Sequence, residues 1–279
     1  MSNSAPEDTY GTQKRMAFIG SAVAAQIPRS VLDVGCGVGN VSLAVAERFP
    51  GISVIGLDSD LTSIEYARRR SGARNVQFLH DSELGADAKF DLIIASEVLE
   101  HVYEPEQFLI SLQGRLNAGG YMIVTVPNGY GPFEIMSLIE GTLRLTGIHG
   151  LLRALRRVMR GGRQAAIATP DTMAVSPHVN FFSHQRLEGL LARAGLTVCS
   201  FQPRTFLCGF LLDNLIRSER LVTWNASVAD RLPVWLSSDW MFLLKGGSPD
   251  MSVAPWKNGF WGRLHRYVNQ RCLGRARKT

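Results

Sequence analysis

The sequence predicts an α/β protein in which helices cover both faces of a mostly parallel sheet. Two observations carry this prediction: short apolar runs alternate with helical patterns through the first half of the chain, and a glycine-rich turn follows the first run. Hydrophobic residues make up 46% of the 279 residues and charged residues 19%, a composition that excludes a disordered chain. A chain of this length can bury a large core.

Seven segments have strand character because they are short, apolar and bounded by turn residues. They are residues 31–34, 53–57, 76–79, 92–95, 121–126, 197–203 and 240–245. Helical patterns cover residues 40–48, 60–70 and 105–116, and Ser183 is expected to cap a further helix over 184–194. We expect Gly119 and Gly120 to end the third of these helices and to open the fifth strand.

The alternation of strands and helices stops between residues 129 and 177. Apolar residues from Leu151 to Met159 recur at the spacing of one helical face, and arginines fall largely on the other face. We therefore expect a basic amphipathic lid inserted after the fifth strand. The predicted organisation is a helical segment at 1–28, a main domain at 29–250 with its lid at about 130–177, and a basic aromatic extension at 251–279.

The formal net charge of +6 is unevenly distributed. Residues 141–170 hold six arginines and residues 251–279 hold seven lysines or arginines, with no acid in either segment. The two segments carry +13, so the rest of the chain carries −7. In the second segment the spacing predicts one apolar helical face, formed by Phe260, Trp261, Leu264, Tyr267 and Val268.

The first residues contain no apolar stretch of the kind found in secretory signals, and the longest apolar runs fall short of the ~18 residues that cross a bilayer. The four cysteines show no CxxC spacing, which argues against a zinc ribbon or a disulfide framework. A cytoplasmic location is the expectation that follows.

The glycine turn reads VLDVGCGVGN over residues 31–40. Glycine permits positive φ and lets backbone N–H groups approach a ligand closely. A dinucleotide would favour G-x-G-x-x-G, whereas the spacing here is G-x-G-x-G, with Asp33 two residues before Gly35. A carboxylate at that position would repel a diphosphate and suits a cationic ligand with an amino group, such as S-adenosylmethionine. The turn alone leaves both ligands open.

Acids also follow the next two predicted strands. Asp58 ends the second strand about twenty residues beyond the turn, where an acid can accept both ribose hydroxyls. Asp81 follows the third strand, where it can receive an adenine amino group. The fourth strand leads into FDLIIASEVLEHV, residues 90–102. Since ligands of open α/β sheets bind outside the carboxyl ends of the strands, these residues are expected to share one crevice.

Together these segments resemble the motif series of class I S-adenosylmethionine-dependent methyltransferases, and they are similar to the branch that contains the ubiquinone-biosynthesis O-methyltransferases. The resemblance covers about residues 29–127 and resumes at 178–196. It implies a Rossmann-like, seven-stranded fold with S-adenosylmethionine as cofactor. The cofactor-binding residues that it implies are Asp33, Gly35, Cys36, Gly37, Gly39, Asp58, Ser59, Asp81, Ser82 and Ser96.

The stretch from Ser96 to His101 is the candidate for chemistry. Glu97, Glu100 and His101 stand at i, i+3 and i+4, on one face of an expected helical turn, and two carboxylates with an imidazole suit Mg²⁺. In the ubiquinone enzymes and in small-RNA 2′-O-methyltransferases, a similar E-x-x-E-H binds a divalent metal. His178 resembles a further metal-binding histidine of the RNA enzymes. The alternative is that these residues shape the pocket or cap the turn.

The expected function is O-methylation of a small or lipophilic hydroxylated acceptor, with His178, Glu97 and His101 as the catalytic candidates. N- or C-methylation is an alternative, and a catalytically silent scaffold is a hypothesis from another class. The basic amphipathic segments favour either packing on the protein or peripheral binding to an anionic membrane surface on the inner face, with a lipid-linked acceptor. Nucleic acid is not favoured as a partner because the predicted catalytic body is acidic.

Overall fold

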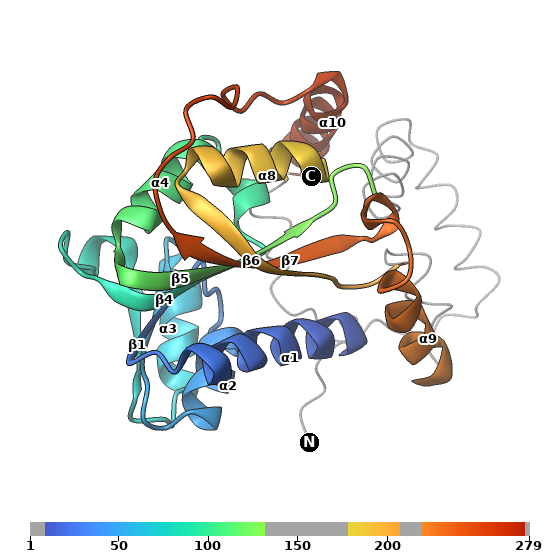
Figure 1. The fold of residues 1–279 in the computed structure, drawn as a ribbon. Helices are drawn as coiled ribbons and strands as arrows, with labels where there is room; N and C mark the ends of the chain where they lie inside the picture. The colour runs from blue at the N-terminus through green and yellow to red at the C-terminus, as the bar shows by residue number, and fades with distance from the viewer. Residues whose placement is uncertain (1–8, 132–177, 207–218, 277–279) are drawn as a thin grey trace.

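The computed structural model describes residues 9–131, 178–206 and 219–276 (Figure 1). The lid expected over about 130–177, including its apolar face at 151–159, lies almost entirely outside these residues. The predicted boundaries between the segments of the chain therefore stay predictions.

A seven-stranded sheet forms the centre of the protein, in the order β3-β2-β1-β4-β5-β7-β6. Strands β1 to β5 are parallel to one another, and β7 runs antiparallel to both β5 and β6, so the mostly parallel Rossmann-like fold is confirmed. The strands are β1 (Ser30–Val34), β2 (Ser53–Asp58), β3 (Val76–His80), β4 (Phe90–Ser96), β5 (Leu116–Pro127), β6 (Leu196–Pro203) and β7 (Asp239–Gly246).

Helices cover both faces of the sheet, with α1, α2 and α3 on one side and α4 and α8 on the other (Figure 1). Adjacent residues of β4 point to opposite faces: Ile94 packs with the first group and Ile93 with the second. The helices are α1 (Thr9–Gln26), α2 (Asn40–Arg48), α3 (Leu61–Arg70), α4 (Pro105–Gly114), α8 (His184–Arg193), α9 (Glu219–Ala229) and α10 (Phe260–Ala276).

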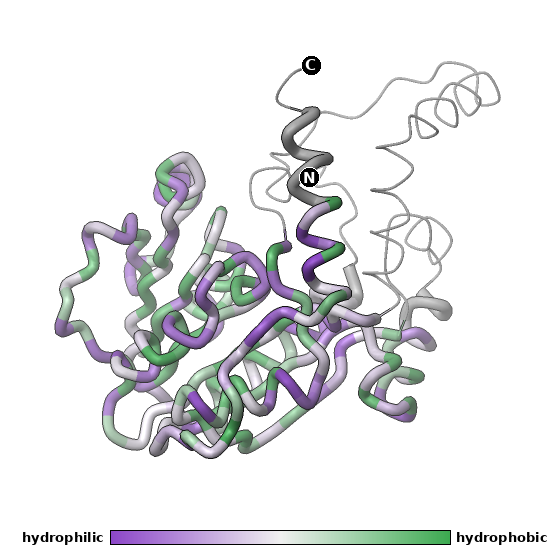
Figure 2. Tube along the Cα trace, turned by 90° about the horizontal axis from the view of Figure 1, so that it is seen from above, coloured by the Kyte–Doolittle hydropathy of each residue, from purple (hydrophilic) through white to green (hydrophobic). Residues whose placement is uncertain are grey.

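The helix ends follow from local chemistry. The Asp60 side chain caps α3 by accepting hydrogen bonds from the backbone N–H groups of Thr62 and Ser63, at 3.3 and 3.0 Å. Ser183 occupies the predicted N-cap position of α8, but its side chain makes no capping hydrogen bond, so that detail of the prediction is wrong. Figure 2 shows that hydrophobic and hydrophilic residues alternate along the helices, as expected for helices that cover a sheet.

The start of the fifth strand differs from the prediction. β5 begins at Leu116, which pairs with Phe90 of β4, and the register then shifts before Leu92. Gly119 has φ +78° and lies inside the strand, so the glycine pair forms an irregularity in β5 and does not precede it. The prediction placed the boundary at the glycines because glycine usually ends an element.

The predicted apolar face of the C-terminal helix is divided in the structure. Val268 is buried and Trp261 half-buried, whereas Phe260 is 75% exposed, Tyr267 53% and Leu264 38%. His265 takes the inner position, buried against the ring of Phe181 at 4.6 Å between centroids. α10 therefore packs on the protein through one face and presents aromatic and aliphatic side chains on another. In the described part of the chain, every helix is too short or too polar to cross a membrane.

Candidate active site

The glycine turn lies at the carboxyl end of β1, as predicted. Gly35, Gly37 and Gly39 all have positive φ, of 66°, 52° and 82°. A Cβ on Gly39 would lie 2.6 Å from the Phe78 ring, so that glycine is required by packing. A Cβ on Gly37 would meet nothing within 4 Å, so the middle of the turn faces open space. This open cradle fits a ligand seated on the turn.

Asp58 and Asp81 converge beside the turn. The carboxylate of Asp58 accepts hydrogen bonds from the backbone N–H of Gly37 at 2.7 Å and from that of Asp60 at 2.8 Å. Partial burial raises the pKa of Asp81, and the negative charge of Asp58 raises it further. The two carboxylates therefore lie close enough at the ends of β2 and β3 for their charges to interact, and their expected contacts with a nucleoside stay predictions.

Asp33 is buried, with only 2% of its surface exposed, and its carboxylate accepts a 2.5 Å hydrogen bond from the Ser42 hydroxyl. Burial raises the pKa of Asp33 to about 7, although the Ser42 hydrogen bonds and the charge of Arg15 act in the opposite direction. The side chain thus joins the glycine turn to the first turn of α2. Its expected contact with the amino group of a cofactor stays a prediction.

Arg15 of α1 is a residue that the sequence analysis missed. Its charge acts on Asp33, and its guanidinium lies 3.9 Å from the carboxylate of Glu97. Its Nε is buried, and the described residues offer it no hydrogen-bond partner. Arg15 therefore places a positive charge between the glycine turn and the end of β4. No pattern within the segment 1–28 distinguishes it from Lys14, the other basic residue there.

The remaining predicted cofactor residues lie along the same edge of the sheet. The Cys36 N–H donates to the Leu57 carbonyl at 3.0 Å, and burial raises the pKa of its thiol, which does not favour a thiolate. Ser59 is exposed directly after Asp58. The Ser82 hydroxyl lies 2.8 Å from His80 Nδ1, and the Ser96 hydroxyl lies 3.0 Å from that of Thr125.

Glu97 is separated from the residues with which it was expected to act. The prediction assumed a helical turn from Glu97 to His101, but Glu97 has φ +57°, and only Leu99–His101 form a short 3-10 turn. Its carboxylate accepts a 2.8 Å hydrogen bond from the Thr125 hydroxyl and points toward Arg204, 3.9 Å away. The prediction that Glu97, Glu100 and His101 share one helical face is therefore wrong.

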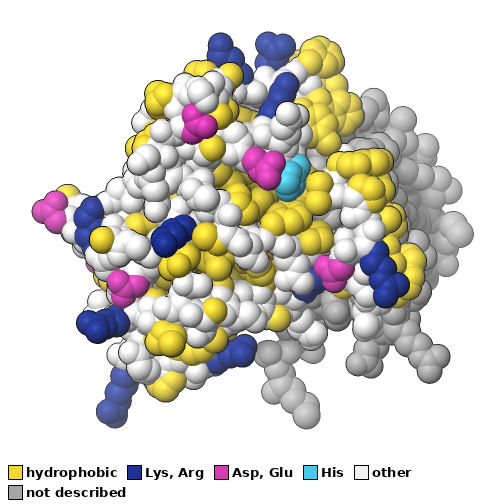
Figure 3. All heavy atoms as spheres, viewed as in Figure 1, with side chains coloured by type: hydrophobic (Ala, Val, Ile, Leu, Met, Phe, Trp, Pro, Cys, Tyr) yellow, Lys and Arg dark blue, Asp and Glu magenta, His cyan; other side chains and the backbone are white. Residues whose placement is uncertain are grey.

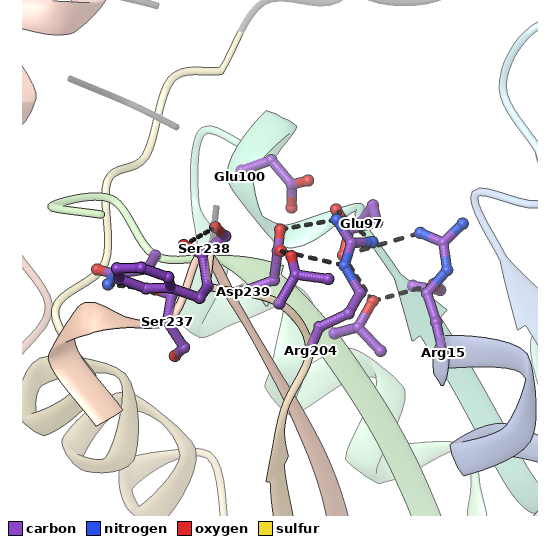
Figure 4. A network of polar contacts seen from close by, with 12 residues as sticks. Arg15, Glu97, Glu100, Arg204, Ser237, Ser238 and Asp239 are labelled. Carbon is purple, nitrogen blue, oxygen red and sulfur yellow. Dashed lines mark hydrogen bonds and ion pairs between the residues drawn. The ribbon is translucent and has the colours of Figure 1, made fainter. Parts of the chain in front are cut away.

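Glu97 instead belongs to a network of charges over the ends of β4, β5 and β7 (Figure 4). Arg204 donates to Asp239 from Nε at 3.0 Å and from Nη2 at 2.9 Å, and both Arg204 and Arg15 lie close to Glu97. Burial opposes the ionisation of Glu97, but the two arginines and the Thr125 hydroxyl outweigh it and keep the pKa of Glu97 below its usual value. Burial raises the pKa of Asp239.

A second cluster joins Glu100, His101 and His178. One potential ligand atom from each residue lies within 4.8 Å of the other two. Glu100 is 1% and His178 8% exposed, and the imidazoles of His101 and His178 meet edge to face with centroids 5.0 Å apart. The sequence analysis named all three residues, but their combination depends on a contact between residues 77 positions apart.

Backbone hydrogen bonds hold His178 against this turn. The N–H groups of Val179 and Asn180 both donate to the Glu100 carbonyl, at 2.7 and 3.0 Å. The Asn180 side-chain amide donates to the carbonyl of Leu99 at 3.1 Å and also to that of Val102. The segment after residue 177 is thus fixed on the 3-10 turn, and the two histidines are brought together as a consequence.

The fold and this edge of the sheet define a class of protein: an α/β protein with the Rossmann-like fold of methyltransferases. The sequence profile of the methyltransferase domain matches residues 12–200, more than half of the chain. The chain therefore belongs to the S-adenosylmethionine-dependent methyltransferase family.

Two relatives illustrate the similarity. The chain is 31% identical over 201 residues to the ubiquinone biosynthesis O-methyltransferase of Chelativorans sp., a match that covers 65% of this chain and 68% of that protein. It is 32% identical over 145 residues to the trans-aconitate 2-methyltransferase of Methylobacterium radiotolerans, which covers 52% of this chain and 50% of that protein. The matches span 50%, 37% and 42% of the lengths of three of the curated relatives, so the chain covers half or less of those relatives.

Among solved structures, the chain is similar to magnesium protoporphyrin IX methyltransferase from Synechocystis PCC 6803 with bound SAH. The TM-score is 0.50 at 16% identity, over 88% of this chain and 89% of that one. At this identity the likeness concerns the fold alone.

Proposed function

We propose that this protein transfers a methyl group from S-adenosylmethionine to the oxygen of a small or lipophilic hydroxylated acceptor. The observation that carries the proposal is the meeting of two groups of residues at one edge of the sheet. The glycine turn, Asp58 and Asp81 form one group, and the Glu100, His101 and His178 cluster forms the other. The first suits a cationic nucleoside, and the second suits the removal of a hydroxyl proton.

The cofactor supplies an electrophilic methyl group on a sulfonium. In the proposed complex Asp58 accepts the ribose hydroxyls and Asp81 accepts from the adenine amino group. The amides of the glycine turn receive the methionine end, beside the charge of Asp33. Arg15 pairs with the methionine carboxylate, because its guanidinium has only a 3.9 Å ion pair with Glu97 among the described residues and lies close to Asp33.

The cluster then prepares the acceptor. His178 or His101 accepts the proton of the hydroxyl group, and Glu100 stabilises the imidazolium that results, since its carboxylate lies 3.9 Å from His101 Nε2. When bound, the cofactor would supply the methyl carbon to the acceptor oxygen, with the sulfonium leaving as a thioether and the acceptor becoming a methyl ether. Positioning of the two reactants supplies much of the rate.

The same cluster can be tested for fit to a metal. Two imidazoles and one carboxylate within 4.8 Å form a plausible donor set, but Glu97 does not contribute the second carboxylate that was expected. A set of two nitrogens and one oxygen is better suited to Zn²⁺ or Mn²⁺ than to Mg²⁺, which favours oxygen ligands. A divalent cation held by Glu100, His101 and His178 would polarise the acceptor oxygen.

Other acceptors remain as alternatives to the hydroxyl group. No described residue fixes the atom that is methylated, so N- and C-methylation stay alternatives, as does a silent scaffold that uses the fold for binding only. The relative named for trans-aconitate suggests a carboxylate acceptor, which would need no base. Peripheral binding on the inner face of the membrane and a lipid-linked acceptor are part of the proposal and rest on the basic segments of the sequence. A cytoplasmic location is also part of the proposal and rests on the spacing of the cysteines.

The test is calorimetric binding of S-adenosylmethionine followed by turnover on matched soluble and prenylated phenols, with aromatic amines and dicarboxylates as comparison acceptors. We expect binding, and turnover on a phenol. His178→Asn should lower kcat by about 10²- to 10⁴-fold and leave the Kd of S-adenosylmethionine within about twofold. Absence of binding would support the scaffold alternative, and turnover on amines or carboxylates alone would overturn hydroxyl methylation.

A further inference from the structure

The outer surface of α10 carries exposed apolar side chains. Phe260, Leu264 and Tyr267 stand at i, i+4 and i+7, so they form one stripe along the helix, and their side chains are 75%, 38% and 53% exposed. The face that packs inward uses His265 and Val268 instead. We call Phe260, Leu264 and Tyr267 the outer stripe. Solvent-exposed Phe and Leu side chains in a row are unusual on a soluble surface.

Positive charge surrounds the outer stripe. Arg263 is exposed one turn from both Phe260 and Tyr267, and Lys257 is exposed just before the helix. Arg266 lies over the ring of Tyr103, 5.7 Å from its centroid, and Tyr103 is itself 64% exposed. In the sequence, residues 251–279 hold seven lysines or arginines and no acid. Figure 3 shows basic and hydrophobic side chains gathered along the upper edge, where Figure 1 places α10.

We propose that the outer stripe is a docking surface for an anionic lipid bilayer. Phenylalanine and leucine side chains can enter the acyl boundary, tyrosine prefers the headgroup level, and arginines beside them can pair with lipid phosphates. An anionic bilayer fits better than other partners because it matches both the charge and the apolar side chains of this surface. An acidic protein would pair with the arginines but would not bury the outer stripe. A neutral apolar partner would bury the stripe but would leave the arginines without anions. Glu104, exposed next to Tyr103, is the acid that opposes this charge locally.

Arg266 of α10 and Asn258, just before the helix, also reach the candidate active site. Arg266 Nε donates to the Val179 carbonyl at 2.9 Å, and the Asn258 amide donates to the same carbonyl at 3.0 Å. Val179 is the neighbour of His178, so the helix that would contact the bilayer also braces the segment that holds this histidine. Docking through α10 would therefore place the candidate active site beside the membrane, in position for a lipophilic acceptor. This last step rests on the proposed methyl transfer, whereas docking through the outer stripe does not depend on that activity.

The test is co-flotation of the full chain with vesicles of phosphatidylglycerol mixed with phosphatidylcholine, compared with vesicles of phosphatidylcholine alone. We expect flotation with the anionic vesicles at low salt and its loss at high salt. Phe260→Ser combined with Tyr267→Ser should abolish flotation, and Arg263→Gln should weaken it several-fold. The matched control is Leu61→Ser with Tyr66→Ser on α3, whose side chains are 52% and 47% exposed, and it should float like the unmodified protein.

Three outcomes would overturn the docking proposal. The first is that the unmodified protein does not float with anionic vesicles at low salt. The second is that the α3 control loses flotation as much as the Phe260→Ser and Tyr267→Ser variant does. The third is binding to single-stranded RNA that is weakened by Arg263→Gln but not by the apolar substitutions. The Kd of S-adenosylmethionine and turnover on a soluble acceptor are measured on the same preparations. Since every substituted side chain is exposed and none belongs to the candidate active site, both should be unchanged, so failure of docking and failure of the proposed enzyme activity give different results.

Discussion

Asp33 is a carboxyl group that the protein buries at the point where a cation is expected to bind. Burial raises its pKa to about 7. The groups that face it are the Ser42 hydroxyl of α2 and the charge of Arg15 from α1, which lower its pKa, and the carboxylate of Asp58 after β2, which raises it. A raised acid pKa stabilises the fold at low pH, and that contribution is lost as the pH rises through about 7. A bound cation would favour the ionised form of Asp33 and would therefore lower its pKa.

We therefore expect S-adenosylmethionine to bind more tightly as the pH rises from about 6 to about 8, with a slope that approaches tenfold per pH unit on the acid side. Binding at neutral pH should release protons, which calorimetry in two buffers of different ionisation enthalpy detects. Asp33→Asn should remove the slope and should raise the melting temperature of the free protein at pH 8. Asp87→Asn, in an exposed loop, is the control and should change neither result.

Glu97 and Glu100 look equivalent in the sequence but lie in different surroundings. Glu97 faces two arginines and a threonine hydroxyl, while Glu100 faces two histidines. The sequence could not separate them, because the positive φ of Glu97 breaks the helical turn that the E-x-x-E-H spacing indicates. A non-glycine residue in that conformation is uncommon and leaves no signature in the pattern.

The two glutamates give a matched pair for the metal hypothesis. After incubation with Mn²⁺ or Zn²⁺ and removal of free metal, elemental analysis should find about one ion per chain. Glu100→Gln should lose it, because a ligand is removed from the cluster, and Glu97→Gln should keep it. Turnover should fall on chelation and recover with Mn²⁺ better than with Mg²⁺. If Glu100→Gln retains the ion, or if chelation leaves turnover unchanged, the cluster acts through its histidines alone.

At the scale of elements, the sequence predicted the strands and helices of the sheet region well, but it predicted less well which face of α10 is exposed. α2 was predicted at its observed bounds, since its apolar spacing and flanking glycine agree. The start of β5 was missed because a glycine inside a strand looks the same as a glycine at its end. The division of the apolar residues of α10 was missed because it depends on which face finds a partner, and Phe181 selects the face that contains His265.

One ion pair ties three elements together and can be tested. Glu106 of α4 accepts from Arg193 of α8 at 2.8 and 2.7 Å and from the backbone N–H of Trp256 at 3.2 Å. Arg193 also donates to the Val253 carbonyl at 2.7 Å. The Arg193 hydrogen bond holds the pKa of Glu106 below its usual value, so the stabilisation is present at neutral pH and is lost as the pH falls through that lowered pKa.

Glu106→Ala should lower the free energy of unfolding by about 2 kcal/mol at pH 7, measured by urea denaturation, because it leaves a mostly buried guanidinium without its carboxylate. The difference from the unmodified protein should shrink in acid. The comparison variant is Glu83→Ala, which removes an exposed 2.6 Å pair with Arg68 and a hydrogen bond from the His80 N–H, and we expect a smaller change there. An equal loss of unfolding free energy in both variants would show that the ion pair between Glu106 and Arg193 stabilises the fold no more than the exposed pair does.

Over the whole molecule, the candidate site is assembled from parts that are distant in the sequence. The glycine turn and the acids after β2 and β3 could be predicted, because the carboxyl ends of parallel strands must share one edge. Arg15 from α1, Arg204 after β6 and Asp239 at the start of β7 could not, since no local pattern indicates that they meet at Glu97. The strand topology therefore explains why the cofactor-binding residues could be predicted. The residues on the acceptor side are brought together by tertiary packing, which the sequence does not reveal.

The stability of the whole fold should report which ligand the cleft takes. Since only the folded chain offers this cleft, S-adenosylmethionine at about 100 times its Kd should stabilise the protein by about 2.7 kcal/mol and raise the melting temperature by about 5 °C. The thioether product should do the same, and NAD should not, because Asp33 and Asp58 oppose a diphosphate. A shift with NAD and none with S-adenosylmethionine would contradict the proposed function.

Gly37 makes this measurement specific to the cradle. Gly37→Val places a side chain in the open space above the turn and should abolish the ligand-induced shift. The substitution also costs roughly 1–2 kcal/mol because valine is strained at φ +52°. Gly119→Val is the matched control: it too has positive φ and nothing within 4 Å of its Cβ, but it lies near the start of β5, away from the carboxyl edge. Both variants should have a lower melting temperature than the unmodified protein, and only Gly119→Val should still be stabilised by S-adenosylmethionine. A ligand-induced rise in the melting temperature of Gly37→Val would mean that the ligand binds elsewhere.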